Sequence, residues 1–277
     1  MSNPHKHHIT LVGCGKMGTA LLSGWLKSGI NAEYVVIDPY APPFENITHL
    51  KKIEDISSLK APDDVFYQTD MFILAVKPQI MGEVISTLAP LRRGPATILS
   101  IAAGQPIANF QDIFGPTAPI IRAMPNTPAA IGRGMTVAVA NDLVTSEHKE
   151  LADTLLKCSG KVEWIINESL MDAITAVSGS GPAYIFYLID VLTQAAEKAG
   201  LDSTLATELA RETVIGAAAL AEAEHDKPAA LLRENVTSPR GTTAAAMEVL
   251  MDGRMQGIFD EAIEAAKKRS IELRKPR

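Results

Sequence analysis

The stretch Gly13-Cys14-Gly15-Lys16-Met17-Gly18 decides the fold that this sequence predicts. A short apolar run over 9–12 precedes it, and an amphipathic helical pattern over 16–28 follows it. A second apolar run, 34–37, leads to Asp38, which stands 20 residues after the last glycine. A glycine turn between a strand and a helix, with an acidic residue at that spacing, is typical of a dinucleotide-binding βαβ unit. A tight structural turn is the alternative interpretation.

Each glycine of this turn has a predicted role. Gly13 permits the tight turn, Gly15 lets the backbone approach a pyrophosphate, and Gly18 lets the helix pack against the strand. The N-terminus of the helix offers N–H groups and a partial positive charge to the diphosphate. Cys14 is interpreted as a small residue rather than a redox centre. The candidate cofactor-binding residues of the turn are Gly13, Cys14, Gly15, Lys16, Met17 and Gly18.

Short apolar runs alternate with helical stretches through the first part of the chain. They are rich in β-branched residues and bounded by turn-forming residues, which indicates strands of a buried parallel sheet. The predicted strands cover 9–12, 34–37, 71–76, 97–101, 120–123 and 135–139. After Trp164 the apolar residues take a helical spacing. The predicted fold class is α/β, with a Rossmann-type dinucleotide-binding domain at 1–166 and an all-helical dimerisation and substrate domain at 167–277.

Composition narrows the classes of partner. The chain has 277 residues, a net charge of −6 and 47% hydrophobic residues, which is ordinary for a soluble globular protein. Nucleic acid and anionic membranes require basic surface, so neither is an expected partner. No run approaches the roughly 18 apolar residues of a membrane span. Cys14 and Cys158 are expected to be reduced thiols in a cytoplasmic protein. No metal site is predicted, since His5, His7 and His8 are assigned to a polar tail.

Several helices of the second domain are apolar on more than one face. Residues 216–221, Gly-Ala-Ala-Ala-Leu-Ala, are an example. A helix that is apolar all round must be buried on all sides, which is difficult for about 110 residues alone. The sequence therefore predicts a homodimer with helices packed between the chains. A tight monomeric bundle is the alternative.

Further candidate cofactor contacts follow the predicted strands, because ligands of such folds bind outside the carboxyl ends of the strands. Lys77 is predicted to face cofactor phosphate or ribose, or else only solvent. Asn126 is predicted to orient a ligand, or else to stabilise its own turn. The candidates at the ends of the Met71 and Thr97 strands are Ala75, Val76, Lys77, Pro78, Ala102 and Ala103.

Asp38 suggests which dinucleotide is preferred. A carboxylate at the end of the second strand accepts hydrogen bonds from the ribose hydroxyls of NADH and repels the 2′-phosphate of NADPH. The following residues, 39–43, contain no Arg or Lys to neutralise that phosphate. The hypothesis is that NADH is preferred and that NADPH is also used. In the competing interpretation Asp38 turns outward and caps a loop.

Two segments of the helical domain interrupt the helical pattern. Residues 178–182, Ser-Gly-Ser-Gly-Pro, allow close approach of another backbone or of a nicotinamide ring. Residues 237–243, Thr-Ser-Pro-Arg-Gly-Thr-Thr, precede an alanine-rich helix, and a helix N-terminus of this kind suits a carboxylate. Ordinary N-capping by Thr242 or Thr243 is the alternative.

These segments together resemble the pyrroline-5-carboxylate reductase family. The matching pieces are GCGKMG, AVKPQ, AAG, MPNTPA, SGSGPAY and VTSPRGTT, which run from Gly13 to Thr243 in the family's order. The resemblance implies reduction of 1-pyrroline-5-carboxylate to L-proline by NADH or NADPH, in homodimers that often assemble into pentamers of dimers. It implies a hydrogen bond from the Thr243 hydroxyl to the ring nitrogen. The implied substrate-binding residues are Ser238, Gly241, Thr242, Thr243 and Asn126, with backbone N–H groups of the loop on the carboxylate.

The sequence departs from the family at Arg240, where the family usually has glycine. If the backbone there needs a positive φ, arginine is costly. Related alternatives are another imine reductase, a β-hydroxyacid-dehydrogenase-like enzyme, or a dinucleotide sensor without catalysis. The β-hydroxyacid dehydrogenases use a lysine in the helix after the glycine-rich turn. The first lysine after Gly181 is Lys198, about four turns too late.

Overall fold

The computed structural model describes residues 6–41, 50–54, 68–90 and 96–274. The expectations for His5 and for residues 42–43 lie outside these ranges. By internal contacts the chain divides into two compact units. The first, called here the sheet unit, comprises Met1–Gly179 and Ala266–Arg277, and the second, the helical unit, comprises Ser180–Ala265.

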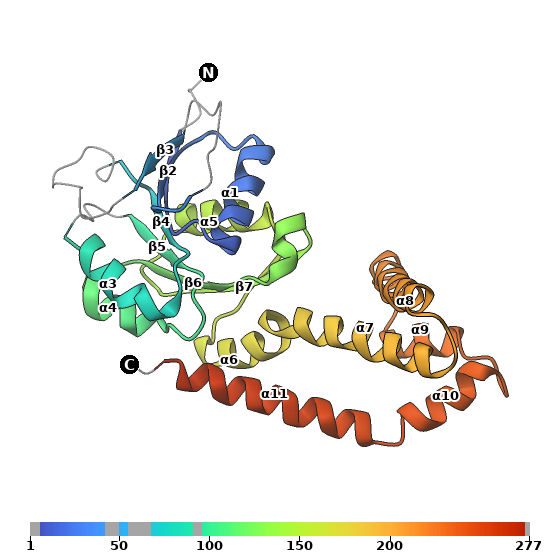
Figure 1. Ribbon diagram of the computed structural model, residues 1–277. Coiled ribbons are helices and arrows are strands. Elements are labelled where there is room, and N and C mark those ends of the chain that lie inside the picture. The colour runs from blue at the N-terminus through green and yellow to red at the C-terminus, as the bar shows by residue number, and fades with distance from the viewer. Residues whose placement is uncertain (1–5, 42–49, 55–67, 91–95, 275–277) are drawn as a thin grey trace. The chain divides into compact units, whose positions relative to one another are not determined.

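An eight-stranded sheet with the order β3-β2-β1-β4-β5-β6-β7-β8 forms the centre of the sheet unit (Figure 1). Strands β1 to β6 pair in parallel, β7 pairs antiparallel with β6, and β8 pairs in parallel with β7. The strands are His7–Val12, Ala32–Ile37, Leu50–Ile53, Met71–Leu74, Thr97–Ser100, Ile120–Met124, Gly134–Ala140 and Gly160–Trp164. The six predicted strands are confirmed, whereas β3 and β8 were not predicted. The first strand begins at His7, so His7 and His8 belong to the sheet and not to a tail.

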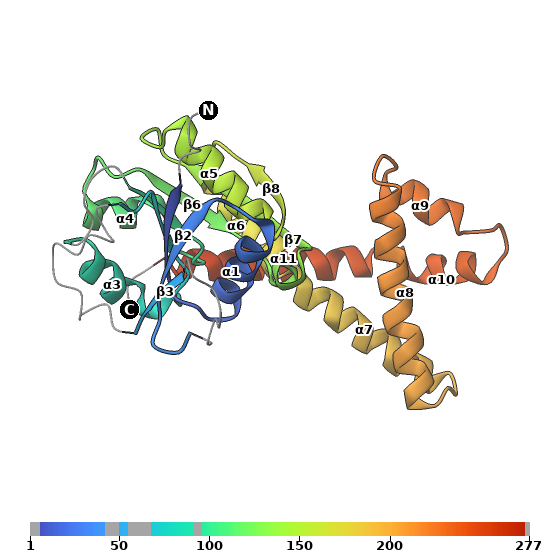
Figure 2. The ribbon, with the colours of Figure 1, turned by 90° about the horizontal axis from the view of Figure 1, so that it is seen from above.

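Helices cover both faces of the sheet (Figures 1 and 2). Helices α1 (Lys16–Ser28) and α5 (Ser146–Lys157) lie on one face, and α3 (Pro78–Leu88) and α4 (Ile107–Phe114) lie on the other. A short 3₁₀ turn, Thr127–Ile131, connects β6 to β7. Two-sided coverage requires strands that are apolar on both faces, and β4 is buried at all four positions.

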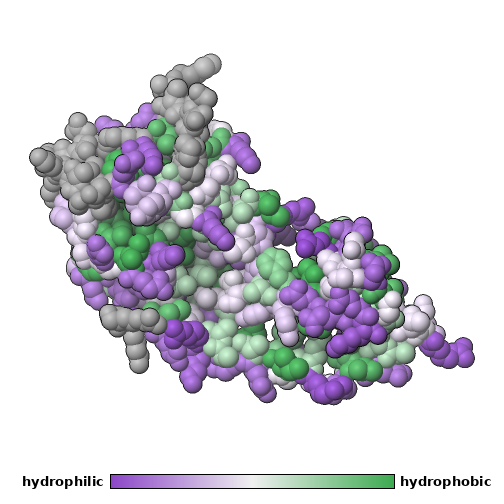
Figure 3. Space-filling view, viewed as in Figure 1, coloured by the Kyte–Doolittle hydropathy of each residue, from purple (hydrophilic) through white to green (hydrophobic). Residues whose placement is uncertain are grey.

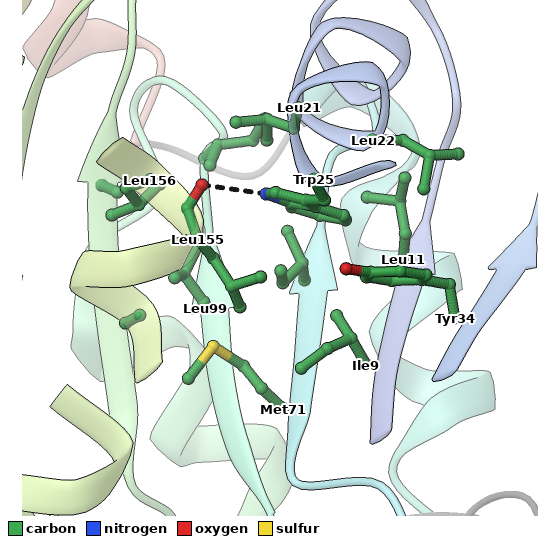
Figure 4. Packing of buried hydrophobic residues seen from close by; sticks show 14 of the residues in the cluster. Ile9, Leu11, Leu21, Leu22, Trp25, Tyr34, Met71, Leu99, Leu155 and Leu156 are labelled. Carbon is green, nitrogen blue, oxygen red and sulfur yellow. Dashed lines mark hydrogen bonds between the residues drawn. The ribbon is translucent and has the colours of Figure 1, made fainter. Parts of the chain in front are cut away.

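Trp25 of α1 is central to the core on the α1 side (Figure 4). Its indole stacks on Tyr34 of β2 with ring centroids 5.8 Å apart, and its Nε1–H donates to Leu155 O of α5 at 2.9 Å. The ring therefore satisfies its one polar atom while burying a large apolar area. These contacts fix α1, and with it the glycine turn that precedes α1, against the sheet.

The segment after β8 belongs to the sheet unit although it has no strands. It comprises a 3₁₀ turn (Glu168–Leu170), α6 (Met171–Ile174) and a π-helical turn (Thr175–Gly179). The buried Asp172 of α6 accepts from Ser270 Oγ at 2.8 Å and pairs with Arg274. This pairing ties the end of α11 (Arg254–Glu272) to α6.

The helical unit has almost no core of its own. It contains α7 (Gly181–Lys198), α8 (Ser203–Ala223), α9 (Ala229–Asn235), α10 (Thr242–Leu250) and the larger part of α11. Throughout residues 180–265, all of which the structure describes, Ala206 and Ala210 are the only buried residues. Large apolar side chains lie on its surface, as the green patches of Figure 3 show. Among the described helices none is long and apolar enough to cross a membrane.

Candidate functional site

The glycine turn between β1 and α1 takes a conformation that requires glycine. Gly13 has φ of +92°, and a Cβ there would lie 2.7 Å from Val76 Cγ1 and 2.8 Å from the Ala75 carbonyl. A Cβ on Gly18 would lie 2.2 Å from the oxygen of Gly13. The turn therefore packs against the end of β4, which brings Ala75 and Val76 beside the glycines, and their contact with a cofactor stays a prediction.

Neither backbone conformation nor packing requires glycine at position 15. It is the N-cap residue of α1 with an ordinary φ of −67°, and a Cβ on it would meet no atom within 4 Å. The space in front of the Gly15 backbone is therefore open. This is the position at which close approach of a ligand to the backbone needs a residue without a side chain.

The N-terminus of α1 is left without a capping side chain. The helix has no acidic residue in its first turn and no side-chain cap, and its first backbone bond runs from Thr19 N to Gly15 O at 2.8 Å. The N–H groups of Gly15, Lys16, Met17 and Gly18 therefore have no acceptor four residues back. Such an end binds a diphosphate, and the residues present fit that group.

Burial raises the pKa of the Cys14 thiol above its ordinary value. Its side chain also lies 3.5 Å from Thr19 Oγ1, and the carbonyl of Cys14 accepts from the same hydroxyl at 2.9 Å. A thiol with a raised pKa is protonated at neutral pH and unreactive. The interpretation of Cys14 as a small packing residue agrees with these contacts.

Asp38 is held by two backbone N–H groups. Its Oδ2 accepts from Cys14 N at 2.6 Å and its Oδ1 accepts from Tyr40 N at 2.6 Å. The carboxylate thus both braces the glycine turn and caps the bend after β2. The bond to Tyr40 N agrees with the loop-capping interpretation, whereas the contact of Asp38 with a ribose and the preference for NADH stay predictions.

The other cofactor candidates lie at the carboxyl ends of β4 and β5. Lys77 is the exposed N-cap residue of α3, and Pro78 begins that helix. Ala102 is buried, and its N–H lies 3.3 Å from Ser100 Oγ. Because β4 and β5 are neighbours in register, these two ends lie at the same edge of the sheet as the glycine turn.

Asn126 uses its side-chain amide inside the sheet unit. Its Oδ1 accepts from Met135 N at 2.8 Å, and its Nδ2 donates to Ser178 O at 3.2 Å. The side chain thereby joins the end of β6 to the start of β7 and to the π-helical turn. A Cβ on Gly179 in that turn would lie 2.7 Å from Met124 Cε, so the approach is close. The predicted contact of Asn126 with substrate stays a prediction.

In the helical unit the loop 237–243 leads into α10. Gly241 is the N-cap residue, and its N–H donates to Ser238 O at 3.0 Å. That donor is engaged within the turn, and the contact of Gly241 with a substrate carboxylate stays a prediction. The first helical bond runs from Ala245 N to Gly241 O, which leaves the N–H groups of Thr242, Thr243 and Ala244 without a helical acceptor. Ala244 was missed because only its place in the helix, and not its side chain, makes it a donor.

The threonine hydroxyls do not cap α10, because the helix has no side-chain cap. The Thr237 hydroxyl donates to Arg233 O at 2.6 Å at the end of α9. One hydroxyl of the loop is therefore engaged in a structural hydrogen bond. Neither the Thr242 nor the Thr243 hydroxyl caps the helix, which favours the ligand-binding interpretation over N-capping.

Arg240 has φ of +61° and is the only residue other than glycine with a positive φ in the described part of the chain. The condition under which arginine is costly at this position is therefore met. An L-residue pays roughly 1–2 kcal/mol for this conformation.

We expect Arg240→Gly to raise the free energy of unfolding by about 1 kcal/mol, because glycine removes the strain but adds freedom to the unfolded chain. Urea unfolding followed by circular dichroism measures the change. Arg240→Ala is the matched control, since it removes the guanidinium but keeps the Cβ and should give no gain. Equal gains in both variants would assign the effect to charge instead of to φ.

The position of the first lysine weighs against β-hydroxyacid chemistry. Gly181 begins α7 and Lys198 ends it. Lys198 stands 17 positions after Gly181, which corresponds to about 25 Å along a helix axis. Lys198 is therefore far from the glycine-rich turn, where a lysine would have to lie to act as a general acid.

Sequence reasoning missed an ion pair between a buried arginine of β6 and a part-exposed glutamate that follows β8. Arg122 on β6 is 2% exposed, and its Nη1 lies 2.9 Å from Glu168 Oε1. The same carboxylate accepts from Ile107 N at the start of α4 at 2.9 Å. An arginine inside an apolar strand was the only available signal, and its partner lies 46 residues away in the sequence.

In the described part of the chain, no cluster of three or more His, Cys, Asp or Glu side chains is arranged to hold a metal ion.

Comparisons with known proteins match both the region of the glycine turn and the region of the α10 loop. Residues 168–273 match the family model for pyrroline-5-carboxylate reductase dimerisation, and residues 8–104 match one for NADP oxidoreductase, coenzyme F420-dependent. A pyrroline-5-carboxylate reductase of Pseudomonas aeruginosa is 38% identical over 99% of this chain and 98% of its own length. One of Pisum sativum is 36% identical over 96% of this chain and 95% of its own.

Solved structures give the same result. A pyrroline-5-carboxylate reductase of Coxiella burnetii superposes with a TM-score of 0.87 at 32% identity and covers 98% of this chain and 100% of its own. The Plasmodium falciparum enzyme, solved with NADP bound, has a TM-score of 0.79 at 28% identity, covering 97% of this chain and 98% of its own. Sequence and fold agree over nearly the whole length, and the chain belongs to the pyrroline-5-carboxylate reductase family.

Proposed function

We propose that this protein reduces the C=N bond of 1-pyrroline-5-carboxylate to form L-proline, with NADH or NADPH as the reductant. The observation that carries this proposal is that one chain contains two helix N-termini suited to anions. The N-terminus of α1 offers a glycine-lined diphosphate site, and the N-terminus of α10 offers uncapped N–H groups with threonine hydroxyls. Family membership over the full length supplies the substrate class.

The dinucleotide, when bound, supplies a hydride. The chain's own part is to hold the diphosphate on the N–H groups of residues 15–18 and to keep the reactive end beside the ends of β4 and β5. The relative from Plasmodium falciparum is described with NADP bound, which supports use of the phosphorylated cofactor here. Residues Ala75, Val76, Lys77, Pro78, Ala102 and Ala103 stay candidates for the remaining contacts.

The loop before α10 binds the substrate in this proposal. The N–H groups of Thr242, Thr243 and Ala244 hold the carboxylate, and Ser238 adds a hydroxyl. The Thr243 hydroxyl contacts the ring nitrogen and orients the imine, and it relays one proton from solvent to the nitrogen of an imine that arrives unprotonated. A protonated imine is already electrophilic, so positioning supplies most of the catalysis and no strong acid is needed.

The experiment is a rate measurement that separates the candidate reactions. The purified protein is given racemic 1-pyrroline-5-carboxylate with NADH or NADPH, and in parallel a 3-hydroxy acid with NAD⁺ or NADP⁺. Oxidation of the reduced cofactor together with proline formation supports the imine reductase. Oxidation of the hydroxy acid would instead support the dehydrogenase, and tight cofactor binding without either reaction would support a sensor.

We further propose a homodimer built by the helical unit, with a pentamer of dimers as a higher assembly. Exposed apolar side chains such as Phe186, Tyr187 and Ile258 are each more than 60% accessible in the single chain. A unit of this size with two buried residues does not have enough core of its own, so a second chain is expected to cover its apolar faces. The dimerisation family model covers this region.

We expect light scattering to give twice the chain mass of 29.6 kDa or an even multiple of it. Tyr187→Glu and Phe186→Glu together should shift the population towards monomer, because buried charge without a partner is costly. A control pair on the sheet unit, Glu147→Lys and Glu150→Lys, should leave the mass unchanged. A monomeric wild-type protein with full activity would overturn the dimer proposal.

The acidic composition and the two free cysteines support a cytoplasmic location, which we also propose. We assign dinucleotide binding to residues 1–166 and dimerisation with substrate binding to 167–277. The support for this boundary is that β8 ends at Trp164, after which the chain is helical.

A further inference from the structure

Strands β2 and β3, which pair on one side of β1, place an acidic and a basic side chain near the glycine turn. Asp38 follows β2 and reaches back to Cys14 N through its Oδ2, while its backbone N donates to Ile53 O of β3 at 3.0 Å. The end of β3 is therefore directly beside Asp38. Strand β3 was not predicted from the sequence, so no basic residue was expected here.

Lys52 lies on the α1 side of the sheet, as Asp38 does. In the β2–β3 ladder Val36 pairs with Lys52 and Ile37 pairs with Ile53. Val36 belongs to the core on the α1 side, whereas Ile37 and Ile53 belong to the core on the α3 side. Neighbouring residues that pair in a sheet point to the same face, so Lys52 projects towards the face that carries the glycine turn.

The ammonium group of Lys52 is accessible to a ligand. The residue is exposed, and its Nζ lies 3.7 Å from Glu54 Oε1, whose side chain is 78% exposed. An exposed pair at that distance contributes little to stability. Lys52 can therefore give up its contact with Glu54 and bind a phosphate with little loss of free energy.

The charges of Asp38 and Lys52 act on the same point of the turn. Burial is the largest influence on the pKa of the Cys14 thiol and raises it, and the hydrogen bond from Thr19 lowers it. Asp38 raises that pKa further and Lys52 lowers it. The two opposite charges are thus both close enough to the glycine turn to influence a group within it.

We propose that Lys52 is a specificity-determining residue, which binds the 2′-phosphate of the adenosine ribose and so makes NADPH acceptable beside Asp38. The adenosine half of a dinucleotide lies at the end of the second strand in this fold, where a carboxylate alone repels a 2′-phosphate. Asp38 is fixed by two N–H groups and cannot turn away without leaving them unpaired. The ammonium of Lys52 offsets that repulsion. This inference rests on the proposed use of NADH or NADPH.

The test measures binding without catalysis. Isothermal titration compares adenosine 2′,5′-bisphosphate with 5′-ADP on the wild-type protein and on Lys52→Met, which keeps the stem and removes the charge. We expect the variant to bind the 2′,5′-bisphosphate about tenfold or more weakly, since a charge-assisted bond is lost. Binding of 5′-ADP should change less than twofold. Lys52→Arg should retain the affinity for the 2′,5′-bisphosphate.

Lys27→Met is the matched control, because Lys27 is an exposed lysine in the last turn of α1, at the opposite end of that helix from the glycine turn. It removes the same charge and should leave both affinities within twofold of wild type. Equal losses for the two nucleotides in Lys52→Met, or no loss for the 2′,5′-bisphosphate, would overturn the proposal. The titration needs no substrate, so a protein that fails to reduce 1-pyrroline-5-carboxylate but shows the selective loss would contradict only the proposed reaction.

Discussion

Gly18→Ala is expected to abolish dinucleotide binding and to lower the free energy of unfolding by about 3 kcal/mol. A Cβ at this position would lie 2.2 Å from the backbone oxygen of Gly13 and 3.1 Å from its carbon. Both neighbours are backbone atoms, so no side-chain rotation relieves the overlap. Either α1 moves away from the end of β1 or the turn opens, and the diphosphate loses its aligned N–H groups in both cases. Urea unfolding and NADH fluorescence titration measure the two effects.

Gly15→Ala is the matched control for that experiment, because its Cβ would enter open space and its φ is ordinary. Its stability should remain within about 0.5 kcal/mol of wild type. Its affinity for NADH should nevertheless fall about tenfold or more, because the methyl group fills the space through which a phosphate approaches the backbone. If Gly18→Ala bound NADH as wild type does, the turn would not be the diphosphate site.

Thr243→Ala is expected to lower kcat with 1-pyrroline-5-carboxylate by about 100-fold. Its hydroxyl is the side chain proposed to contact the ring nitrogen, and the loss should appear in turnover because that bond strengthens as the nitrogen changes its charge. The variant should remain folded and bind NADH normally, since Thr243 lies in the helical unit, at the start of α10. Steady-state kinetics with both cofactors measure the effect.

Thr243→Ser should recover most of the turnover, because it restores a hydroxyl at the same place. Thr237→Ala is a control in the same loop, since its hydroxyl is engaged with Arg233 O and is not proposed to contact substrate. It should retain turnover close to that of wild type. Wild-type kcat in Thr243→Ala would remove Thr243 from the mechanism.

The βαβ unit around the glycine turn was predictable because local signals and tertiary structure agree there. The apolar run of β1, the glycine turn and the amphipathic helix over Lys16–Ser28 all specify the same structure. Strand β3 escaped prediction because two lysines stand between Leu50 and Ile53, a pattern that suits an edge strand but does not look apolar. The antiparallel direction of β7 depends on pairing with β6, which a single sequence does not encode locally.

The candidate site was predictable in its residues more than in its contacts. The motif identified Asp38, but its bonds to Cys14 and Tyr40 depend on how β2 ends beside the turn. The strain at Arg240 followed from a glycine expected by resemblance. The use of the Gly241 N–H by Ser238 O did not follow, because a helix N-cap is located only when the turn before it is known. Lys52 was missed together with the strand that carries it.

The central claim is that a hydride passes from the reduced cofactor to the imine carbon of 1-pyrroline-5-carboxylate. The most direct test uses NADPH and NADH deuterated at C4 of the nicotinamide, in each of the two configurations, with mass spectrometry and NMR of the proline formed. We expect one deuterium per proline, at C5, from one configuration only, and one cofactor oxidised for each L-proline formed. Proline without deuterium from either labelled cofactor, or cofactor oxidation without L-proline, would contradict it.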